Sequence, residues 1–412
     1  MSFFQTRNGV LHVEDVSLPA IAEAVGTPAY VYSAGALRSA ATSFVNALSS
    51  VPRKHVAFAV KANPNAAVLK LLAQCGLGAD IVSAGEMRRA LASGIAPKSI
   101  VFSGVGKTDR ELADALAADV GQFNLELEQE GEVLGAMAQA RGQRATALLR
   151  VNPDVDGGTH AKISTGRAEN KFGVPLAAAP AIYERISQIA GLDLLGVAVH
   201  IGSQLRDLVP LEAAFSRVGQ LITRLRAQGH AVSRVDLGGG LGIAYRPVEA
   251  VATPAAYGEM VARCTKGWDV DLVFEPGRVI AGPAGILLTR VIWVKPGLVH
   301  PFVIVDAAMN DLMRPALYDA HHRFQAVQGR SGTMCAAIAG PVCESGDTFA
   351  CAGEIERVER GDLAVFRDTG AYGAAMASTY NCRPLSPQVL VDGNRFTVVG
   401  ERNLLGDLEF AA

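Results

Sequence analysis

The chain has 412 residues, 50% of them hydrophobic, and a formal net charge of -2. This length exceeds what one hydrophobic core usually serves, so we expect two domains. Because the charge is nearly balanced and no basic run is present, nucleic acid and anionic membrane surfaces are poor candidate partners. A small polar substrate is favoured instead.

The amino-terminal residues include no apolar segment of signal-peptide length, and no later stretch has about 18 consecutive uncharged apolar residues. The six cysteines, at positions 75, 264, 335, 343, 351 and 382, follow neither CxxC nor zinc-ligand spacing. Free thiols in a reducing compartment are therefore expected. We expect a soluble cytoplasmic protein with no bound metal.

Between about residues 30 and 280, short apolar runs alternate with longer segments of helical period, a pattern typical of repeated βα units. Helices over Ala66–Gln74, Ala84–Ser93 and Leu211–Gln228 have clear start and stop signals. The predicted strands are Tyr30–Ser33, His55–Val60, Ala79–Val82, Ile100–Ser103, Gln122–Leu125, Ala147–Val151, Leu195–His200, Val235–Leu237 and Leu272–Phe274. A (β/α)8 barrel is predicted, with the first strand outside it; a doubly wound open sheet is the alternative.

After about residue 282 the pattern changes to strand-like runs separated by turns, which predicts a mostly antiparallel β-domain. Its predicted strands are Gly285–Val294, Pro301–Val305, Thr333–Ile338, Asp362–Arg367, Pro387–Val391 and Arg395–Val398. The amino-terminal run Val10–Val13 can extend this sheet. The predicted domains are a barrel over residues 26–281 and a β-domain formed by residues 1–25 with 282–412.

One lysine, Lys61, stands at the end of the apolar strand His55–Val60, where a helix begins. Burying an ammonium among Val, Ala and Phe side chains costs free energy, so the free amine, which can condense with a carbonyl, is favoured. That is the chemistry of a Schiff-base lysine. A strand-end lysine that reaches into solvent is the alternative.

Other polar residues fall at the ends of predicted barrel strands. Asp80, His200, the run Gly238–Gly240 and the segment Glu275–Arg278 each lie at or just after a strand. Because barrel active sites lie at the carboxyl ends of the strands, one mouth should gather these residues with Lys61.

Two glycine-containing segments predict a phosphate site. The run Gly238–Gly240 can present successive backbone N–H groups to an anion, and Gly277 with Arg278 adds a second nest and a cation. A tight turn without a ligand is the alternative. The dinucleotide fingerprint fails because position 243, where its third glycine would fall, is Ile243. The segment Ser103–Thr108, which includes Lys107, fails as a P-loop because position 101, where the first glycine must stand, is Val101.

A Schiff-base lysine, a phosphate cradle and a buried acid at neighbouring strand ends together indicate pyridoxal phosphate. The chain resembles the pyridoxal-phosphate-dependent decarboxylases of the alanine-racemase fold in the order and spacing of Ala59–Asn63, His200–Gln204, Gly238–Ile243, Glu275–Arg278 and Gly340–Asp347. The resemblance covers essentially the whole chain, including Asn310–Tyr318 and Gly370–Gly373. Within the family it looks like the diaminopimelate decarboxylases. This implies decarboxylation of meso-2,6-diaminopimelate at its D-centre to L-lysine and CO₂, the last step of lysine biosynthesis.

Residue roles follow from this resemblance. Lys61 would form the Schiff base with pyridoxal phosphate, and His200 would stack on the ring face. The implied cofactor-binding residues are Lys61, Asp80, His200, Ser203, Gly239, Gly240, Glu275, Gly277, Arg278 and Tyr372. A core histidine with satisfied hydrogen bonds is the alternative for His200.

Glu275 matches the family's partner for the pyridine nitrogen. A carboxylate there favours the protonated ring, which is a strong electron sink for the electrons left when CO₂ departs. Racemases of the same fold place an arginine near that nitrogen, which keeps the sink weak. Glu275 therefore argues for decarboxylation, with a structural pairing to Arg278 as the alternative.

The resemblance also implies a homodimer with shared active sites. Cys343 and Glu344 match a segment that enters the partner's site, where Cys343 would assist protonation or product release and Glu344 would hold the distal ammonium of the substrate. The implied substrate-binding residues are Arg278, Arg314, Tyr318, Glu344 and Tyr372, of which Arg278, Arg314 and Tyr318 would grip the distal carboxylate. The alternatives are a buried, inert Cys343 and a surface ion pair at Arg314.

Three other functions stay open at the level of the sequence. A relative could act on ornithine, arginine or a carrier-bound glutamyl group, although ornithine-type enzymes have an aspartate after the cysteine. A non-catalytic pyridoxal-phosphate protein and a binding protein without a cofactor are the others. The Gly-rich segment 154–166 is predicted to be a loop over the site that closes on substrate, or an ordinary solvent loop.

Overall fold

The computed structural model describes residues 3–158, 162, 165 and 170–402. The chain forms two compact units. The β unit comprises Met1–Ala40, Ala244–Glu249 and Ile280–Ala412, and the barrel unit comprises Ala41–Ile243 and Ala250–Val279.

The barrel unit is built on eight parallel strands that close on themselves. The strands are β5 (Lys54–Ala59), β6 (Gly78–Ile81), β7 (Ile100–Phe102), β8 (Gln122–Leu125), β9 (Ala145–Asn152), β11 (Leu192–Val199), β12 (Arg234–Asp236) and β13 (Asp271–Phe274). Closure comes from the pairing of β13 with β5 and of β8 with β9. The predicted barrel is confirmed, and the open doubly wound sheet is wrong. The short strand β10 (Val174–Pro175) adds to β9 in parallel.

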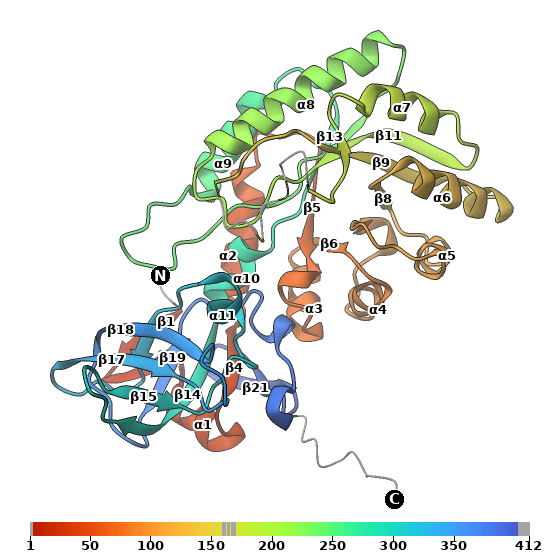
Figure 1. Cartoon of the computed structure of the whole chain (residues 1–412). Coiled ribbons are helices and arrows are strands. Elements are labelled where there is room, and N and C mark those ends of the chain that lie inside the picture. Colours follow the sequence, from red (N-terminus) through yellow and green to blue (C-terminus); the bar gives the residue numbers. More distant parts are fainter. Residues whose placement is uncertain (1–2, 159–161, 163–164, 166–169, 403–412) are drawn as a thin grey trace, which may run out of the picture. The chain divides into compact units, whose positions relative to one another are not determined.

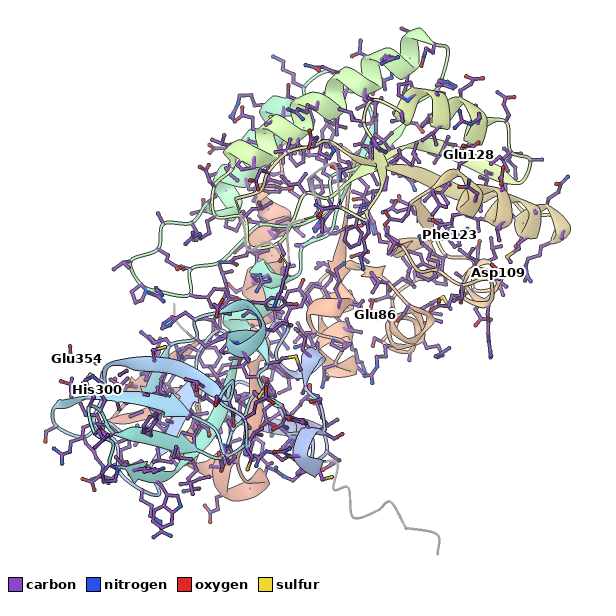
Figure 2. The ribbon with its side chains drawn as sticks, viewed as in Figure 1. Glu86, Asp109, Phe123, Glu128, His300 and Glu354 are labelled. Carbon is purple, nitrogen blue, oxygen red and sulfur yellow. The ribbon has the colours of Figure 1, made fainter. Side chains whose placement is uncertain are left out.

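Helices follow the strands, and α3 to α8 lie around the outside of them (Figure 1). They are α2 (Ala34–Ala47), α3 (Ala66–Gln74), α4 (Ala84–Ala92), α5 (Asp109–Ala117), α6 (Glu128–Ala140), α7 (Ala179–Ser187), α8 (Val209–Ala227), α9 (Pro254–Cys264) and α10 (Arg278–Ala281). Thr108 and Glu111 form a capping box at the start of α5, a device worth about 1 kcal/mol. Asp109 and Glu128, in the first turns of α5 and α6, carry their carboxylates on this outer layer (Figure 2).

Alternation along the strands divides the barrel into an outer and an inner set of side chains. On β8, Phe123 faces the outer layer and packs against Phe102, with the ring centroids 6.2 Å apart. Its neighbours Gln122 and Asn124 are buried polar residues that point the other way. The interior therefore holds polar groups as well as small apolar ones, which are the clustered side chains of Ala57, Val101 and Val273.

The β unit contains a larger, mostly antiparallel sheet, in which only the β15–β17 and β20–β4 pairs are parallel. Its strands are β4 (Ala29–Ser33), β14 (Gly285–Lys295), β15 (Phe302–Val305), β16 (Phe324–Ala326), β17 (Thr333–Ala339), β18 (Thr348–Glu356), β19 (Leu363–Phe366), β20 (Gln388–Asp392) and β21 (Arg395–Gly400). The predicted antiparallel β-domain is confirmed. The first predicted strand, β4, lies here between β14 and β20, so its placement outside the barrel is also confirmed.

The prediction that Val10–Val13 extends this sheet is confirmed only at its first residues, where Val10 forms an isolated antiparallel bridge with Gln328, just after β16, and the Leu11 N–H donates to the Val327 carbonyl. As a strand the segment is β2, which pairs in a separate three-stranded sheet with β1 (Phe4–Arg7) and β3 (Val16–Ser17). Asn8 and Gly9 both have positive φ, 50° and 78°, so a two-residue turn pairs β2 with β1. Helix α1 (Leu18–Val25) follows this sheet.

The free-thiol prediction agrees with the structure. All six cysteines are free. Among the helices that the structure describes, none has the length and apolar character needed to cross a membrane.

Candidate active site

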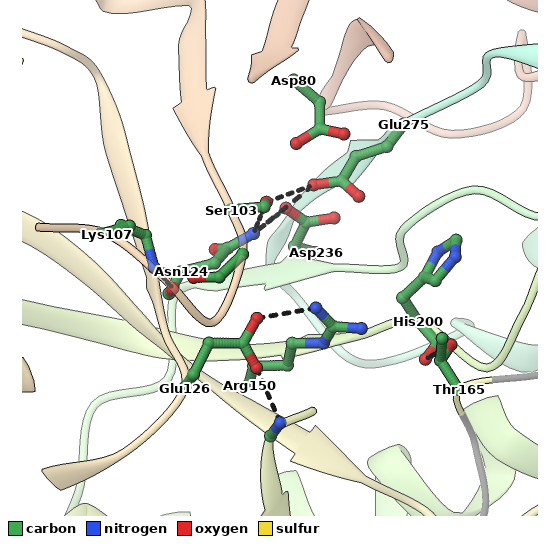
Figure 3. Close-up of polar contacts among 12 residues, drawn as sticks. Asp80, Ser103, Lys107, Asn124, Glu126, Arg150, Thr165, His200, Asp236 and Glu275 are labelled. Carbon is green, nitrogen blue, oxygen red and sulfur yellow. Dashed lines mark hydrogen bonds and ion pairs between the residues drawn. The ribbon is translucent and has the colours of Figure 1, made fainter. Parts of the chain in front are cut away.

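A cavity of about 370 Å³ opens at the carboxyl ends of the barrel strands. Its lining includes Lys61, Asn124, His200, Asp236 and Glu275, which come from five different strand ends. The lysine and the glutamate that the sequence singled out therefore face one cavity. Figure 3 shows the polar network that forms much of its wall.

Lys61 lies in a short 3-10 turn, Val60–Ala62, directly after β5. Its Nζ is 2.5 Å from Asp80 Oδ2, and the Asp80 side chain is fully buried on β6. The purely apolar environment expected from the local sequence was therefore wrong, because the next strand supplies a carboxylate. This ion pair holds the Lys61 amine beside the end of β6.

Glu86, in the first turn of α4, is a site neighbour that the sequence analysis missed. Burial raises the pKa of its carboxyl to about 7, and the nearby Asp80 charge adds to this while Lys61 opposes it. Its Oε2 accepts a hydrogen bond from the Val82 backbone, and its N–H donates to the Ser83 hydroxyl. The Ser-x-x-Glu spacing was a visible signal, but a capping motif predicts a helix start and not a neighbour for Lys61.

Glu275 follows β13 and is almost fully buried. Its Oε1 accepts from the Ser103 hydroxyl at 3.3 Å and from Asn124 Nδ2 at 3.4 Å. Burial raises the pKa of Glu275 well above its usual range, and the charges of Asp236 and Asp80 raise it further. The predicted alternative, a structural ion pair with Arg278, is not what holds this carboxyl.

His200 follows β11 and has a defined protonation state. Burial lowers the pKa of its imidazole well below the usual range, and the charges of Arg150 and Lys61 lower it further. Its Nδ1 accepts a hydrogen bond from the Gly239 N–H at 3.2 Å. Both the burial and this bond, which occupies the Nδ1 lone pair, favour the neutral ring with its proton on Nε2.

The glycine run Gly238–Gly240 is required by close backbone packing. A Cβ at Gly239 would lie 2.1 Å from the Glu275 carbonyl oxygen, and one at Gly240 would lie 2.5 Å from that of Gly202. The N–H groups of Gly238 and Gly239 donate to Asp236 and to His200. These two donors are used within the protein, which differs from the predicted row of N–H groups directed at an anion.

The predicted cation of the phosphate site is buried beside a hydroxyl. Arg278 begins α10 and is 6% exposed, and its Nη2 donates to Ser203 Oγ at 3.0 Å. Gly277, which precedes it, is also buried. The structure thus brings Ser203 and Arg278 together from two strand ends, as a pair of donors suited to phosphate oxygens.

Two buried ion pairs at or beside the cavity wall were also missed. Arg150 on β9 pairs with Glu126 at 2.7 Å and lies over the Phe172 ring. Lys107, considered above only within a rejected P-loop reading, is fully buried and pairs with Glu130 at 2.6 Å. Its Nζ also donates to the carbonyls of Gly104 and Asn124. Lys107 therefore fixes the loop beside the cavity and is not a phosphate ligand.

In the β unit, Arg314 is 4% exposed, so the alternative of a surface ion pair fails. It begins α11 (Arg314–Tyr318), the helix that also carries the predicted Tyr318. Arg314 Nη1 donates to the Tyr245 hydroxyl at 2.9 Å and lies 2.8 Å from His322 Nε2, while His322 Nδ1 lies 2.9 Å from the Arg367 carbonyl. Because the Arg367 carbonyl can only accept, His322 carries its proton on Nδ1 and accepts from Arg314.

Cys343 and Glu344 lie on an exposed turn of the β unit, so the alternative of a buried, inert Cys343 fails. Glu344 Oε2 accepts from the Tyr380 hydroxyl at 2.9 Å. The carboxylate of Asp347 anchors the turn, since it accepts from the N–H groups of Val342 at 2.7 Å and Met309 at 2.6 Å.

Tyr372 has a backbone conformation that is rare for an aromatic residue, with φ of 58°. Such a conformation costs on the order of 1–3 kcal/mol and persists only where the surroundings fix it. The sequence motif predicted Tyr372 as a site residue but gave no sign of this strain.

The predicted loop 154–166 lies partly outside the described residues, which lack 159–161, 163–164 and 166. Thr165 is described, and its hydroxyl donates to the His200 carbonyl at 2.9 Å. Thr165 also lines the cavity. This segment therefore contributes a contact at the site in addition to the strand ends.

Comparison with known proteins agrees with this geometry. The family model of the pyridoxal-dependent decarboxylase, pyridoxal binding domain, matches residues 36–282. The diaminopimelate decarboxylase of Zymomonas mobilis is 50% identical over 408 residues, covering 98% of this chain and 97% of that one. The chain belongs to the diaminopimelate decarboxylase family.

Solved structures of the diaminopimelate decarboxylase family share the fold. The enzyme from Helicobacter pylori complexed with L-lysine superimposes with a TM-score of 0.91 at 37% identity, covering 95% of this chain and 98% of that one. The enzyme from M. jannaschii in co-complex with L-lysine gives a TM-score of 0.92 at 34% identity, covering 97% and 95%. As a member of this family, the chain is a pyridoxal-phosphate-dependent decarboxylase.

The residues present fit pyridoxal phosphate. Three carboxyl groups, those of Asp80, Asp236 and Glu275, are buried close to Lys61, and Asp80 Oδ1 has no hydrogen-bond partner among the described residues. These three buried carboxyl groups favour a cationic ring nitrogen in their neighbourhood. The Ser203 and Arg278 donors suit a phosphate, and a neutral His200 suits contact with an aromatic face.

Proposed function

We propose that this protein removes the carboxylate at the D-centre of meso-2,6-diaminopimelate and releases L-lysine and CO₂. The observation that carries the proposal is that Lys61 and Glu275 line one cavity of a barrel whose relatives are diaminopimelate decarboxylases over the whole chain. The L-lysine bound in the Helicobacter pylori structure supports an amino-acid ligand and matches the expected product.

Bound pyridoxal phosphate supplies a ring that accepts the electron pair left when CO₂ departs. We propose that Lys61 would be the covalent attachment point of the cofactor, and that Asp80 would hold the Lys61 ammonium whenever that bond is open. Their contact of 2.5 Å supports this second role. Asp80 thereby keeps the displaced lysine close to the site.

Glu275 is proposed to hold a proton at the ring nitrogen, and His200 to cover the ring face. The buried position of Glu275 supports the first role, because a charge interaction is stronger away from water. The neutral state of His200 supports the second, because an imidazolium would oppose a cationic ring. Ser203, Gly239, Gly240, Gly277, Arg278 and Tyr372 are proposed to surround the phosphate.

The β unit is proposed to supply contacts to the substrate and to the partner subunit. On the family resemblance, Arg278, Arg314 and Tyr318 are proposed to bind the distal carboxylate, Glu344 to bind the distal ammonium, and Tyr372 to contact the substrate. The fixed geometry of Arg314 supports this, since an oriented guanidinium loses little freedom on binding a carboxylate. The six free thiols support a reducing compartment, and we propose the cytoplasm.

A substrate panel tests the proposal. We expect CO₂ release from meso-2,6-diaminopimelate at least about 100-fold faster, as kcat/KM, than from ornithine, arginine or lysine, because these lack a distal carboxylate to pair with buried arginines. The measurement is CO₂ release with absorbance of the cofactor recorded in parallel. Faster release from ornithine or arginine would assign the chain to a related decarboxylase, and a yellow protein that releases no CO₂ would make it a cofactor carrier.

We further propose a homodimer whose active sites are shared, because Cys343 and Glu344 lie on an exposed turn. Mixing the inactive variants Lys61→Ala and Cys343→Ala should restore activity, up to about one quarter of the wild-type value if subunits exchange at random and each site needs one residue from each subunit. The measurement is CO₂ release after demonstrated subunit exchange. Activity no greater than the sum of the separate variants would show that each subunit completes its own site.

A further inference from the structure

We propose that Asp236 is a positioning residue for Glu275, and that these two buried carboxyl groups share one proton, which is already in place when the ring nitrogen of the cofactor arrives. The inference rests on the proposed role of Glu275 at that nitrogen. It adds a second carboxyl and a source for the proton.

The two carboxyl groups occupy adjacent strand ends. Asp236 ends β12, Glu275 follows β13, and the two strands pair in parallel. Both side chains are buried, with exposures of 1% and 8%. Asn124 joins them, because its Nδ2 lies 3.0 Å from Asp236 Oδ2 and 3.4 Å from Glu275 Oε1 (Figure 3).

The surrounding donors make Asp236 the ionised member of the pair. Its Oδ2 also accepts from Gln122 Nε2 at 2.9 Å, and its Oδ1 accepts from the Gly238 N–H at 2.9 Å. These two bonds and the one from Asn124 stabilise a carboxylate against the burial that raises the pKa of Asp236. Glu275 has weaker contacts, to Ser103 at 3.3 Å and to Asn124, and the Asp236 charge raises its pKa further. The shared proton therefore resides on Glu275.

The described cations nearby have other partners. Lys61 pairs with Asp80 at 2.5 Å, Arg150 pairs with Glu126 at 2.7 Å, and Arg234 donates to the Gln122 side-chain oxygen at 3.4 Å. The charged and titratable groups around the pair are His55, Lys61, Asp80, Arg150, His200, Arg234 and Tyr257. Two adjacent carboxylates without a cation of their own cannot both ionise in a buried site, so one proton stays.

This arrangement balances charge before and after the cofactor binds. Before the cofactor binds, the pair holds one carboxylate, Asp236, and one carboxylic acid, Glu275. When the ring nitrogen reaches Glu275, the O–H bond of Glu275 breaks, an N–H bond forms, and Glu275 becomes a carboxylate beside a pyridinium. No proton is needed from solvent. The negative charge of Asp236 stays next to Glu275 and keeps the basicity of the Glu275 carboxylate high.

The first experiment uses the wild-type apoprotein and needs no variant of Asp236. The infrared difference spectrum of wild-type apoprotein minus Glu275→Gln at neutral pH should show a carboxylic-acid C=O band that disappears when pyridoxal phosphate is added; the subtraction removes the band of Glu86, whose carboxyl has a pKa of about 7. If this difference band is missing, or if it survives cofactor binding, the shared proton is refuted.

The second experiment counts protons. Calorimetric titration of apoprotein with pyridoxal phosphate, in two buffers of different ionisation enthalpy, gives the net proton uptake. Asp236→Asn should take up about one proton per site more than wild type, because Glu275 then starts as a carboxylate. Asp311→Asn is the matched control, since Asp311 is a buried aspartate of the β unit with its own hydrogen bonds to Ser386 and Ala308, and it should behave as wild type.

Equal uptake by Asp236→Asn and wild type, with the bound ring protonated in both, would overturn the role of Asp236. Both experiments omit the substrate, so they separate this inference from the proposed function. A failed substrate panel with a positive proton count would leave the carboxyl pair standing, and the reverse result would leave the decarboxylase standing without it.

Discussion

Lys61→Ala should lose the visible absorbance band of the lysine-bound cofactor and at least about 10³-fold of the CO₂ release rate. Among the described residues that line the cavity, Lys61 is the lysine, because the nearby Lys107 is turned away and paired with Glu130. Among these described lining residues, no second amine could replace it. Absorbance spectra and single-turnover CO₂ release, recorded on the same preparation, check the result.

Lys54→Ala is the matched control for this variant. Lys54 begins the same strand, β5, at the end away from the cavity, and its Nζ donates to the Val51 carbonyl. This control should keep both the band and the activity. If Lys61→Ala keeps the band while purified free of wild-type protein, the covalent attachment lies elsewhere and the central lysine of the proposal is wrong.

Glu275→Gln should lower kcat by about 10²- to 10³-fold while changing the affinity for pyridoxal phosphate less than about 10-fold. Glutamine keeps the size of the side chain and can still accept from Ser103, but it cannot neutralise a pyridinium. The ring would then be a weaker electron sink, although Ser203 and Arg278 would still hold the phosphate. Measured kcat, together with a cofactor titration, separates the two effects.

The pH dependence of apoprotein stability provides a second readout for Glu275→Gln. Because the folded-state pKa of Glu275 is raised above its ordinary value of 4.5, its stabilising contribution is complete below that pH and is lost as the pH rises through the folded-state value. Wild type should therefore lose stability relative to Glu275→Gln as the pH rises above 4.5. Glu128→Gln, at an exposed pair on α6, is the control and should show neither the loss of kcat nor the change in pH dependence.

In the rate and cofactor measurements, equal losses of kcat and of cofactor affinity in Glu275→Gln would instead assign Glu275 a binding role.

The barrel could be predicted from the sequence because its strands are short apolar runs bounded by turn residues. Strands such as β8 and β13 agree with their predicted bounds to within one residue. Strand β18 was missed because Ala350–Gly353 contains residues of low strand propensity, and only its pairing with β17 makes it a strand. The position of Val10–Val13 depended on a local turn that outweighed the pairing expected with a distant sheet.

The site was predicted in part for the same reason. Lys61 and Glu275 stand at strand ends, where a barrel places its chemistry, so local sequence was enough to find them. The roles of Asn124, Arg150 and Glu86 depend on partners that come from other strands. No residue spacing in the sequence predicts these contacts, because only the closure of the barrel brings the partner strands together.

Asp347 joins two stretches of backbone with a single carboxylate, the turn that carries Cys343 and the segment that leads into Arg314. A shift of either stretch must therefore be transmitted to the other. Changes made at these two places should not act independently, and a redesign of the proposed substrate contacts for a shorter diamino acid would have to treat both stretches together.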